Sequence, residues 1–339
     1  MSSTYYFRLC LTIFSLISFV FSSHPAYAQT GASADTTTAT KKLTQNLFRP
    51  LVIAYERYGG SNFTTDTPSG RAGQGRIAST DVFLANLSLP ILIRKQFYLL
   101  GNVGYQLQNH RLENLDFSGL PLDTTEIPET RTNQSFSVGV NVIKRFSIQS
   151  KKFMVLANAS VLTQDFTGPY QLAGFLGAGY IFPTTSRFKG TAGLMVLLNQ
   201  KSSIPVIPVA TIYYRINDHW DLDSNFPLYA YLRRNLNERA WVGPGVEVRG
   251  FNFIFPATAA SLFPGEDLRL RNTEIRYGFR YEQRINKLFL VGAKAGLKTN
   301  LNHRLGEKSQ PSNDYYLESR IREAVYFNIN LSFSPQLSR

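Results

Sequence analysis

Cysteine is almost absent from this sequence. The only one, Cys10, lies in the first apolar stretch. If that stretch is removed during export, the mature chain has no thiol. Disulfide bonds, thiolate metal sites and cysteine nucleophiles are then excluded.

Long apolar runs are also missing after residue 28, so we predict no membrane-spanning helix. The N-terminus differs. Arg8 precedes the apolar stretch Leu9–Phe21, and Ala26-Tyr27-Ala28 forms a small-x-small site. This pattern predicts a signal peptide over residues 1–28, cleaved near Ala28. We expect a flexible, polar lead over residues 29–46 and a single domain over residues 47–339, because no second shift in composition is visible.

Motifs for metal, cofactor or nucleotide binding are lacking as well. No histidine stands at zinc-ligand spacing from another ligand, and there is no Walker loop or dinucleotide fingerprint. We therefore expect no metal, no cofactor and no catalytic residue. One alternative stays open, an outer-membrane lipid hydrolase at a barrel rim, because His110 has Asp116 and Ser118 close in sequence.

Acidic residues are fewer than basic ones: 23 Asp and Glu stand against 36 Lys and Arg, for a net charge of +13. Such an excess often indicates a nucleic-acid or anionic-surface partner. Here the cations are spread through strand-like segments and form no basic run, so we expect no nucleic acid.

What the chain does have is a period of two. In Val325–Phe333 the odd positions are apolar (Val, Phe, Ile, Leu and Phe), and the even positions are Tyr, Asn, Asn and Ser. Lipid offers the backbone no hydrogen-bond partner, so a sheet spans a membrane only when it closes on itself. Alternation of this kind along an exported chain predicts an all-β fold, a single antiparallel transmembrane β-barrel.

Two kinds of connection separate the predicted strands. The short ones, expected on the periplasmic side, are 94–96, 146–151, 183–187, 217–219, 235–237 and 286–287. The longer ones, expected outside, are 59–75, 110–130, 251–269 and 303–318, with briefer ones at 166–169 and 200–203. With one more reversal near 224–227 the alternation gives fourteen strands, and if residues 220–234 form one strand it gives twelve.

The C-terminal third predicts a basic wall inside the lumen, because charges facing lipid would prevent insertion. The cations assigned to this wall are Arg233, Arg249, Arg276, Arg280, Arg284, Lys294, Lys298, Arg320 and Arg322. The acids assigned as their partners are Glu247, Glu274 and Glu282. The unpaired excess is expected either to attract small anionic solutes or to interlock and close the lumen.

One segment has a recognisable pattern: a strand that contains prolines, a turn of the form Asn-x-x-Trp, and a strand rich in tyrosine. It comprises residues 204–222, IPVIPVATIYYRINDHWDL, followed by Phe226-Pro227 and the segment YAYLRRNL. In this the chain resembles an uncharacterised outer-membrane β-barrel family of the Bacteroidetes, a domain of unknown function. The resemblance implies the same fold and carries over no activity and no functional residue. One departure is that Phe333 is followed by six more residues, whereas such chains usually end on an aromatic residue.

Together these features predict a Gram-negative outer-membrane β-barrel with the role of a passive pore or a general envelope role. The alternative is a plugged structural or surface-interaction barrel. The expected partners are outer-membrane lipids, the barrel-assembly machinery and small anionic solutes. The segment 251–263 is unexpectedly apolar for an external loop, and it either folds into the lumen, lines an apolar entry or packs on the rim.

Overall fold

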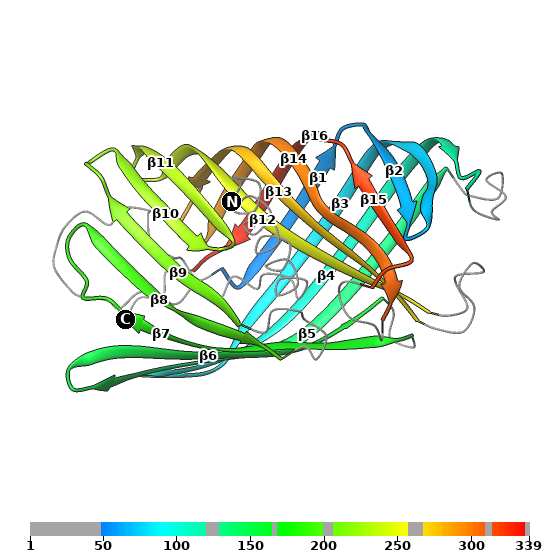
Figure 1. The fold of residues 1–339 in the computed structure, drawn as a ribbon. Helices are drawn as coiled ribbons and strands as arrows, with labels where there is room; N and C mark the ends of the chain where they lie inside the picture. Colours follow the sequence, from blue (N-terminus) through cyan, green and yellow to red (C-terminus); the bar gives the residue numbers. More distant parts are fainter. Residues whose placement is uncertain are drawn as a thin grey trace, which may run out of the picture.

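The computed structural model describes residues 49–119, 129–164, 168–198, 206–256, 267–308 and 314–335. All regular structure in them is β (Figure 1). The strands are β1 Leu51–Tyr58, β2 Ser61–Thr67, β3 Gly70–Arg94, β4 Phe97–Asp116, β5 Thr130–Ile148, β6 Lys151–Thr163, β7 Tyr170–Ile181, β8 Phe188–Leu197, β9 Val206–Arg215, β10 Trp220–Phe226, β11 Tyr229–Asn237, β12 Ala240–Phe255, β13 Leu268–Arg284, β14 Phe289–Glu307, β15 Leu317–Ile321 and β16 Ala324–Phe333. In the described part of the chain, no helix is long and apolar enough to cross a membrane.

The strands close into one antiparallel ring. From β2 to β15 each strand pairs with the next one in sequence, β16 pairs with β14, and β1 closes the ring by pairing with β16 on one side and β3 on the other. β2 continues β1 beyond Gly59-Gly60, and β15 leads into β16, so each of these pairs counts once in the wall. The sixteen assigned strands therefore make a fourteen-stranded barrel, which confirms the predicted architecture.

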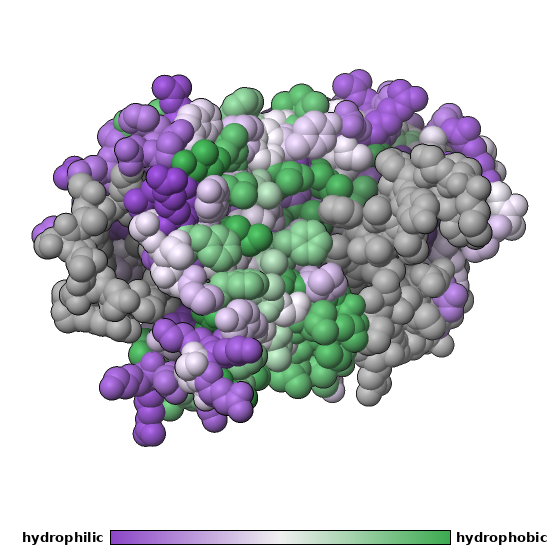
Figure 2. Space-filling model, turned by 60° about the vertical axis from the view of Figure 1, so that its left-hand side comes forward, coloured by the Kyte–Doolittle hydropathy of each residue, from purple (hydrophilic) through white to green (hydrophobic). Residues whose placement is uncertain are grey.

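Side-chain alternation explains why this ring suits lipid. In β16, Val325, Phe327 and Ile329 are exposed, whereas Tyr326 and Asn328 are buried on the lumen side. Figure 2 shows apolar side chains gathered across the middle of one face, with hydrophilic side chains towards its borders. This outward belt is the surface expected of a transmembrane barrel.

An aromatic row marks the short-turn end of the belt. It runs along β5 to β8 through Phe146, Phe153, Tyr180, Phe182 and Phe188, with ring centroids of successive members 5.1–5.9 Å apart. Aromatic girdles of this kind lie at membrane interfaces.

The connections partly differ from those predicted. The reversal expected near 224–227 is present at Pro227-Leu228, whereas the turn expected at 235–237 lies at Glu238-Arg239. Much of the predicted external loops is strand: β2 and the start of β3 occupy most of 59–75, and β4, β12 and β14 run on to Asp116, Phe255 and Glu307. The extensions of β3, β4 and β14 are polar, because side chains above the lipid need no apolar outward face, whereas the end of β12, Phe251–Phe255, is apolar and buried.

Candidate functional site

The lumen side of β1 and β10–β14 carries a buried cluster of charges, which we call the lumen charge cluster. Its members are Arg49, Glu56, Asp223, Arg233, Glu247, Arg249, Glu274, Arg276, Arg280, Glu282, Lys294 and Lys298. Strand alternation positions them, because in each strand every second residue points inward.

The centre of the cluster is Glu56, on β1. Its carboxylate accepts hydrogen bonds from Arg276 Nη2 at 2.9 Å, Tyr58 Oη at 2.6 Å and Asn328 Nδ2 at 2.9 Å, and it also pairs with Arg249. The Glu56 residue is 2% exposed, and the Arg276 residue is 1% exposed. A carboxylate removed so far from water is tolerated only when its oxygens are satisfied in this way.

Arg276 is also held by its other neighbours. Its Nε donates to Glu274 Oε1 at 2.6 Å. Its guanidinium carbon lies 5.2 Å from the ring centroid of Tyr58 and 5.3 Å from that of Tyr326, within the range of cation–π contacts. Lys298 Nζ completes this part of the cluster at 3.3 Å from Glu274 Oε2.

A second part of the cluster surrounds Glu247. Lys294 Nζ lies 2.5 Å from Glu247 Oε1, and Tyr231 Oη donates to the same oxygen at 2.5 Å. Gly245 makes room for the Tyr231 ring, because a Cβ built on Gly245 would lie 2.2 Å from it.

Glu282 anchors the third part. It accepts two bonds from Arg49, Nη1 at 2.8 Å and Nη2 at 3.0 Å, one from Arg280 Nη2 at 2.5 Å and one from Trp241 Nε1 at 3.1 Å. The guanidinium of Arg233 stands 5.0 Å from the Trp241 ring centroid and pairs with Asp223 at 2.8 Å. The described cluster thus joins segments from Arg49 to Lys298 through charge-assisted bonds.

Of the predicted wall, the structure brings Arg233, Arg249, Arg276, Arg280, Lys294 and Lys298 together with Glu247, Glu274 and Glu282. Arg284 is buried nearer the turn and donates to Lys287 O at 3.2 Å. Arg320 and Arg322 are exposed and stand apart from the cluster; the Arg320 side chain is 76% exposed and pairs with Asp66 at 3.6 Å. The strand is interrupted between β15 and β16, so the even-numbered Arg320 and Arg322 are exposed, whereas the even-numbered Tyr326 and Asn328 of β16 are buried.

Sequence reasoning missed Glu56, Asp223 and Arg49. Alternation along β1 could have placed Glu56 on the lumen side. Ala54 and Tyr58 share its buried face, whereas Tyr55 and Arg57 are exposed. The three acids predicted for the wall were therefore an incomplete set, and the basic excess is smaller than the sequence count implied.

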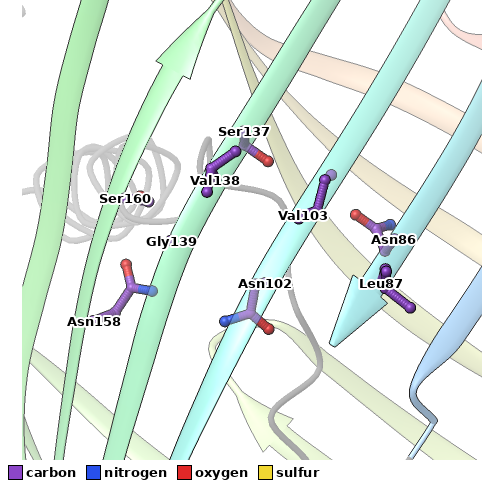
Figure 3. Close-up of a pocket in the computed structure, with 10 residues that line it drawn as sticks. Asn86, Leu87, Asn102, Val103, Ser137, Val138, Gly139, Asn158 and Ser160 are labelled. Atoms are coloured by element: carbon purple, nitrogen blue, oxygen red, sulfur yellow. The ribbon is translucent and has the colours of Figure 1, made fainter. Parts of the chain in front are cut away.

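Another part of the wall, on β3 to β6, has polar, uncharged side chains around a small pocket. β3 to β6 form a pocket in which Asn86, Asn102, Ser137, Asn158 and Ser160 stand beside the apolar Leu87, Val103 and Val138 (Figure 3). Ser88 Oγ donates to Asn102 Oδ1 at 2.8 Å, and Asn158 Nδ2 donates to Asn141 Oδ1 at 2.7 Å. The lumen charge cluster therefore lies on β1 and β10–β14, whereas this pocket on β3–β6 is lined by uncharged side chains.

The lumen is also narrow between β5 and β12. Parts of β12 approach β5 across it, with Cα–Cα separations of 8 Å or less. Because these strands are far apart around the ring, two parts of the wall approach each other there.

The residues of the hydrolase alternative do not form a triad in the described structure. His110 Nδ1 lies 2.9 Å from Thr80 Oγ1. Ser118 donates its backbone N–H to Asp116 Oδ1 at 3.1 Å, and this bond lowers the pKa of the Asp116 carboxyl. Among the described residues, no group of three His, Cys, Asp or Glu side chains could hold a metal ion.

Comparison with known proteins identifies no family: no family model matches the chain, and no curated protein matches it. Among solved structures, an outer-membrane channel from Pseudomonas putida is 9% identical, with a TM-score of 0.38 over 89% of this chain and 100% of that one. A FadL homologue from Pseudomonas aeruginosa is 9% identical, with a TM-score of 0.37 over 85% and 91%. The translocator domain of the autotransporter NalP from Neisseria meningitidis is 7% identical, with a TM-score of 0.33 over 96% and 97%. By its own strand pairings, the chain is a fourteen-stranded transmembrane β-barrel.

Proposed function

We propose that this chain is an outer-membrane transport barrel whose lumen is held closed along its axis by the lumen charge cluster. The observation that carries the proposal is the burial of Glu56, Glu274 and Arg276 in mutual contact on the lumen side of the wall. A wide water-filled pore would leave such groups hydrated. Passage along the axis then requires these ion pairs to separate.

The same proposal assigns the basic wall a role in selectivity. Cations predominate among the charged groups of the cluster, so the path that forms when ion pairs separate favours small anionic solutes over cations. Outer-membrane lipids and the barrel-assembly machinery are the other partners that this proposal implies.

A conductance measurement tests both points. In planar bilayers we expect the wild type to be mostly closed, with brief openings whose reversal potential in a salt gradient indicates anion preference. Arg276→Ala and Arg280→Ala should lengthen the openings and reduce that preference, whereas exposed Arg322→Ala should change neither. A large, steady conductance in the wild type, or a cation preference, would contradict the proposal.

A plugged structural barrel is the second candidate, and the approach of β12 to β5 across the lumen favours it. The two candidates predict different conductance for the arginine variants. A plugged barrel stays silent in planar bilayers even when Arg276 or Arg280 is replaced.

Location is tested separately. We expect the protein in the outer-membrane fraction with residues 1–28 removed, because the signal pattern directs export and the outward belt needs lipid. N-terminal sequencing of the purified protein and fractionation by density measure this. Recovery from the soluble periplasm would rule out the location.

A further inference from the structure

The two ends of the barrel differ in the charge that they expose. The short connections lie at one end, which faces the periplasm in barrels of this kind. Exposed cations surround these connections, and we call them the basic collar: Arg94, Lys95, Lys144, Lys151, Lys152, Arg187, Arg234, Arg239 and Lys287. Against them, the exposed acids described at this end are Asp218 and Glu238.

The end with the longer loops is different, because its cations pair with acids of the same chain. The pairs are Arg57 with Asp81, Arg111 with Glu113, Arg304 with Glu318, Lys308 with Asp267 and Arg320 with Asp66. Within the described residues, no cation of the basic collar forms such an ion pair. The charge of the collar therefore needs a partner from outside the described protein.

Part of the collar lies on the outward face of the barrel. Lys144 on β5 shares its strand face with Val138, which is 55% exposed. Its partners in register are Phe97 on β4 and Val155 on β6, and Arg94 on β3 pairs with the other side of Phe97. Directly paired residues lie on the same face of a sheet, so Arg94, Phe97 and Lys144 form an outward row across three strands.

This outward row lies where the hydrocarbon layer ends. Phe146 of the aromatic row follows Lys144 by two residues on the same strand face and stacks on Phe153, with ring centroids 5.8 Å apart. Lys151 shares the face of Phe153 and pairs in register with the exposed Ile148. Long cationic side chains beside such a girdle keep their methylene groups on apolar surface and place their charge among lipid headgroups. The counter-charge for these cations is thus expected in the headgroup layer.

We propose that the outward part of the basic collar, Arg94, Lys144 and Lys151, binds the phosphate groups of anionic phospholipids in the inner leaflet of the outer membrane. A headgroup phosphate accepts charge-assisted hydrogen bonds from guanidinium and ammonium groups. A zwitterionic lipid carries its own ammonium group beside the phosphate, so it gains less from these cations than phosphatidylglycerol does. The inference goes beyond transport and rests on the proposed function only for its membrane setting.

The test is native mass spectrometry of the full mature chain in detergent, titrated with phosphatidylglycerol or with phosphatidylcholine of the same acyl chains. We expect the wild type to bind phosphatidylglycerol at least about fivefold more tightly, since one basic residue near a membrane surface contributes a factor of about five. The double substitution Arg94→Gln with Lys144→Gln should abolish this preference. Lys144→Arg, which keeps the charge, should retain it.

The matched control is Arg57→Gln with Arg111→Gln, which removes two exposed cations at the opposite end of the barrel. It should leave the lipid preference unchanged. A second measurement covers the case in which the collar variant does not assemble. Raising ammonium acetate from about 0.05 M to about 0.5 M should weaken phosphatidylglycerol binding by the wild type, because salt screens exposed charges.

Equal affinity of the wild type for the two lipids, or a preference that survives both the double substitution and high salt, overturns the inference. Co-sedimentation with purified peptidoglycan tests another anionic partner. If the double substitution abolishes that binding and leaves lipid preference unchanged, the collar binds the cell wall and the lipid assignment is wrong. A chain that binds neither lipid also contradicts the membrane setting, whereas a missing preference leaves the proposed closure of the lumen, which conductance tests, unaffected.

Discussion

Arg276→Ala is expected to lower the free energy of unfolding by about 3–5 kcal/mol, the cost typical of breaking a buried ion pair by removing one partner. The reason is specific to this position. Both Glu56 and Glu274 are buried against Arg276, and its removal leaves two carboxylates short of a counter-charge. Urea unfolding of the protein in vesicles, followed by tryptophan fluorescence, measures the change.

The control for this experiment is Arg320→Ala, because the Arg320 side chain is 76% exposed and its pair with Asp66 is a surface contact. It should cost about 1 kcal/mol or less. The double substitution Arg276→Met with Glu56→Gln should cost less than the sum of its single substitutions, since it removes charge of both signs. A loss below about 1 kcal/mol for Arg276→Ala would show that water reaches the cluster.

Ile329→Arg is expected to cost about 2–4 kcal/mol, because it places a guanidinium on the lipid face at mid-height of β16. The Ile329 residue is 46% exposed on the outward belt. Val325→Arg, on the same face four residues closer to the outer rim, should cost about 0–1 kcal/mol, as expected near a membrane interface.

The rim assignment of Val325 has support in the structure. Glu323 lies two residues before it, between β15 and β16, and accepts hydrogen bonds from Tyr277 Oη at 2.9 Å and Thr299 Oγ1 at 3.0 Å, so polar groups begin at that level. Equal costs for the two substitutions would mean that the belt does not follow the bilayer as described.

The fold could be predicted from the sequence because one rule governs every strand. Lipid on one side and a lumen on the other impose the period of two, and the alternation in 325–333 was sufficient to assign both faces of β16 correctly. Turn positions were less certain, since residues such as Asn235 and Asn237 favour turns wherever they stand, and pairing with β12 moved the reversal to Glu238-Arg239.

The candidate site could be predicted only in part. Alternation places Arg276 and Glu274 on the lumen side, but it does not say which carboxylate from a distant strand meets a given cation. Glu56 lies 220 residues before Arg276, and only closure of the ring brings them together. The approach of β12 to β5 was beyond the sequence for a similar reason, because these strands meet only across the closed ring.

The bonding of Glu56 has a consequence for the order in which the barrel is built. Its hydrogen-bond partners include Arg249 and Asn328, which follow it by 193 and 272 residues. Until β16 docks against β1, this carboxylate lacks Asn328 and the first strand keeps an open edge. The earliest-made strand is thus completed last, so a chain that stops short of β16 leaves this buried carboxylate without one of its hydrogen-bond donors beside an unpaired edge. The seam that closes the ring therefore also discriminates between complete and incomplete copies of the protein.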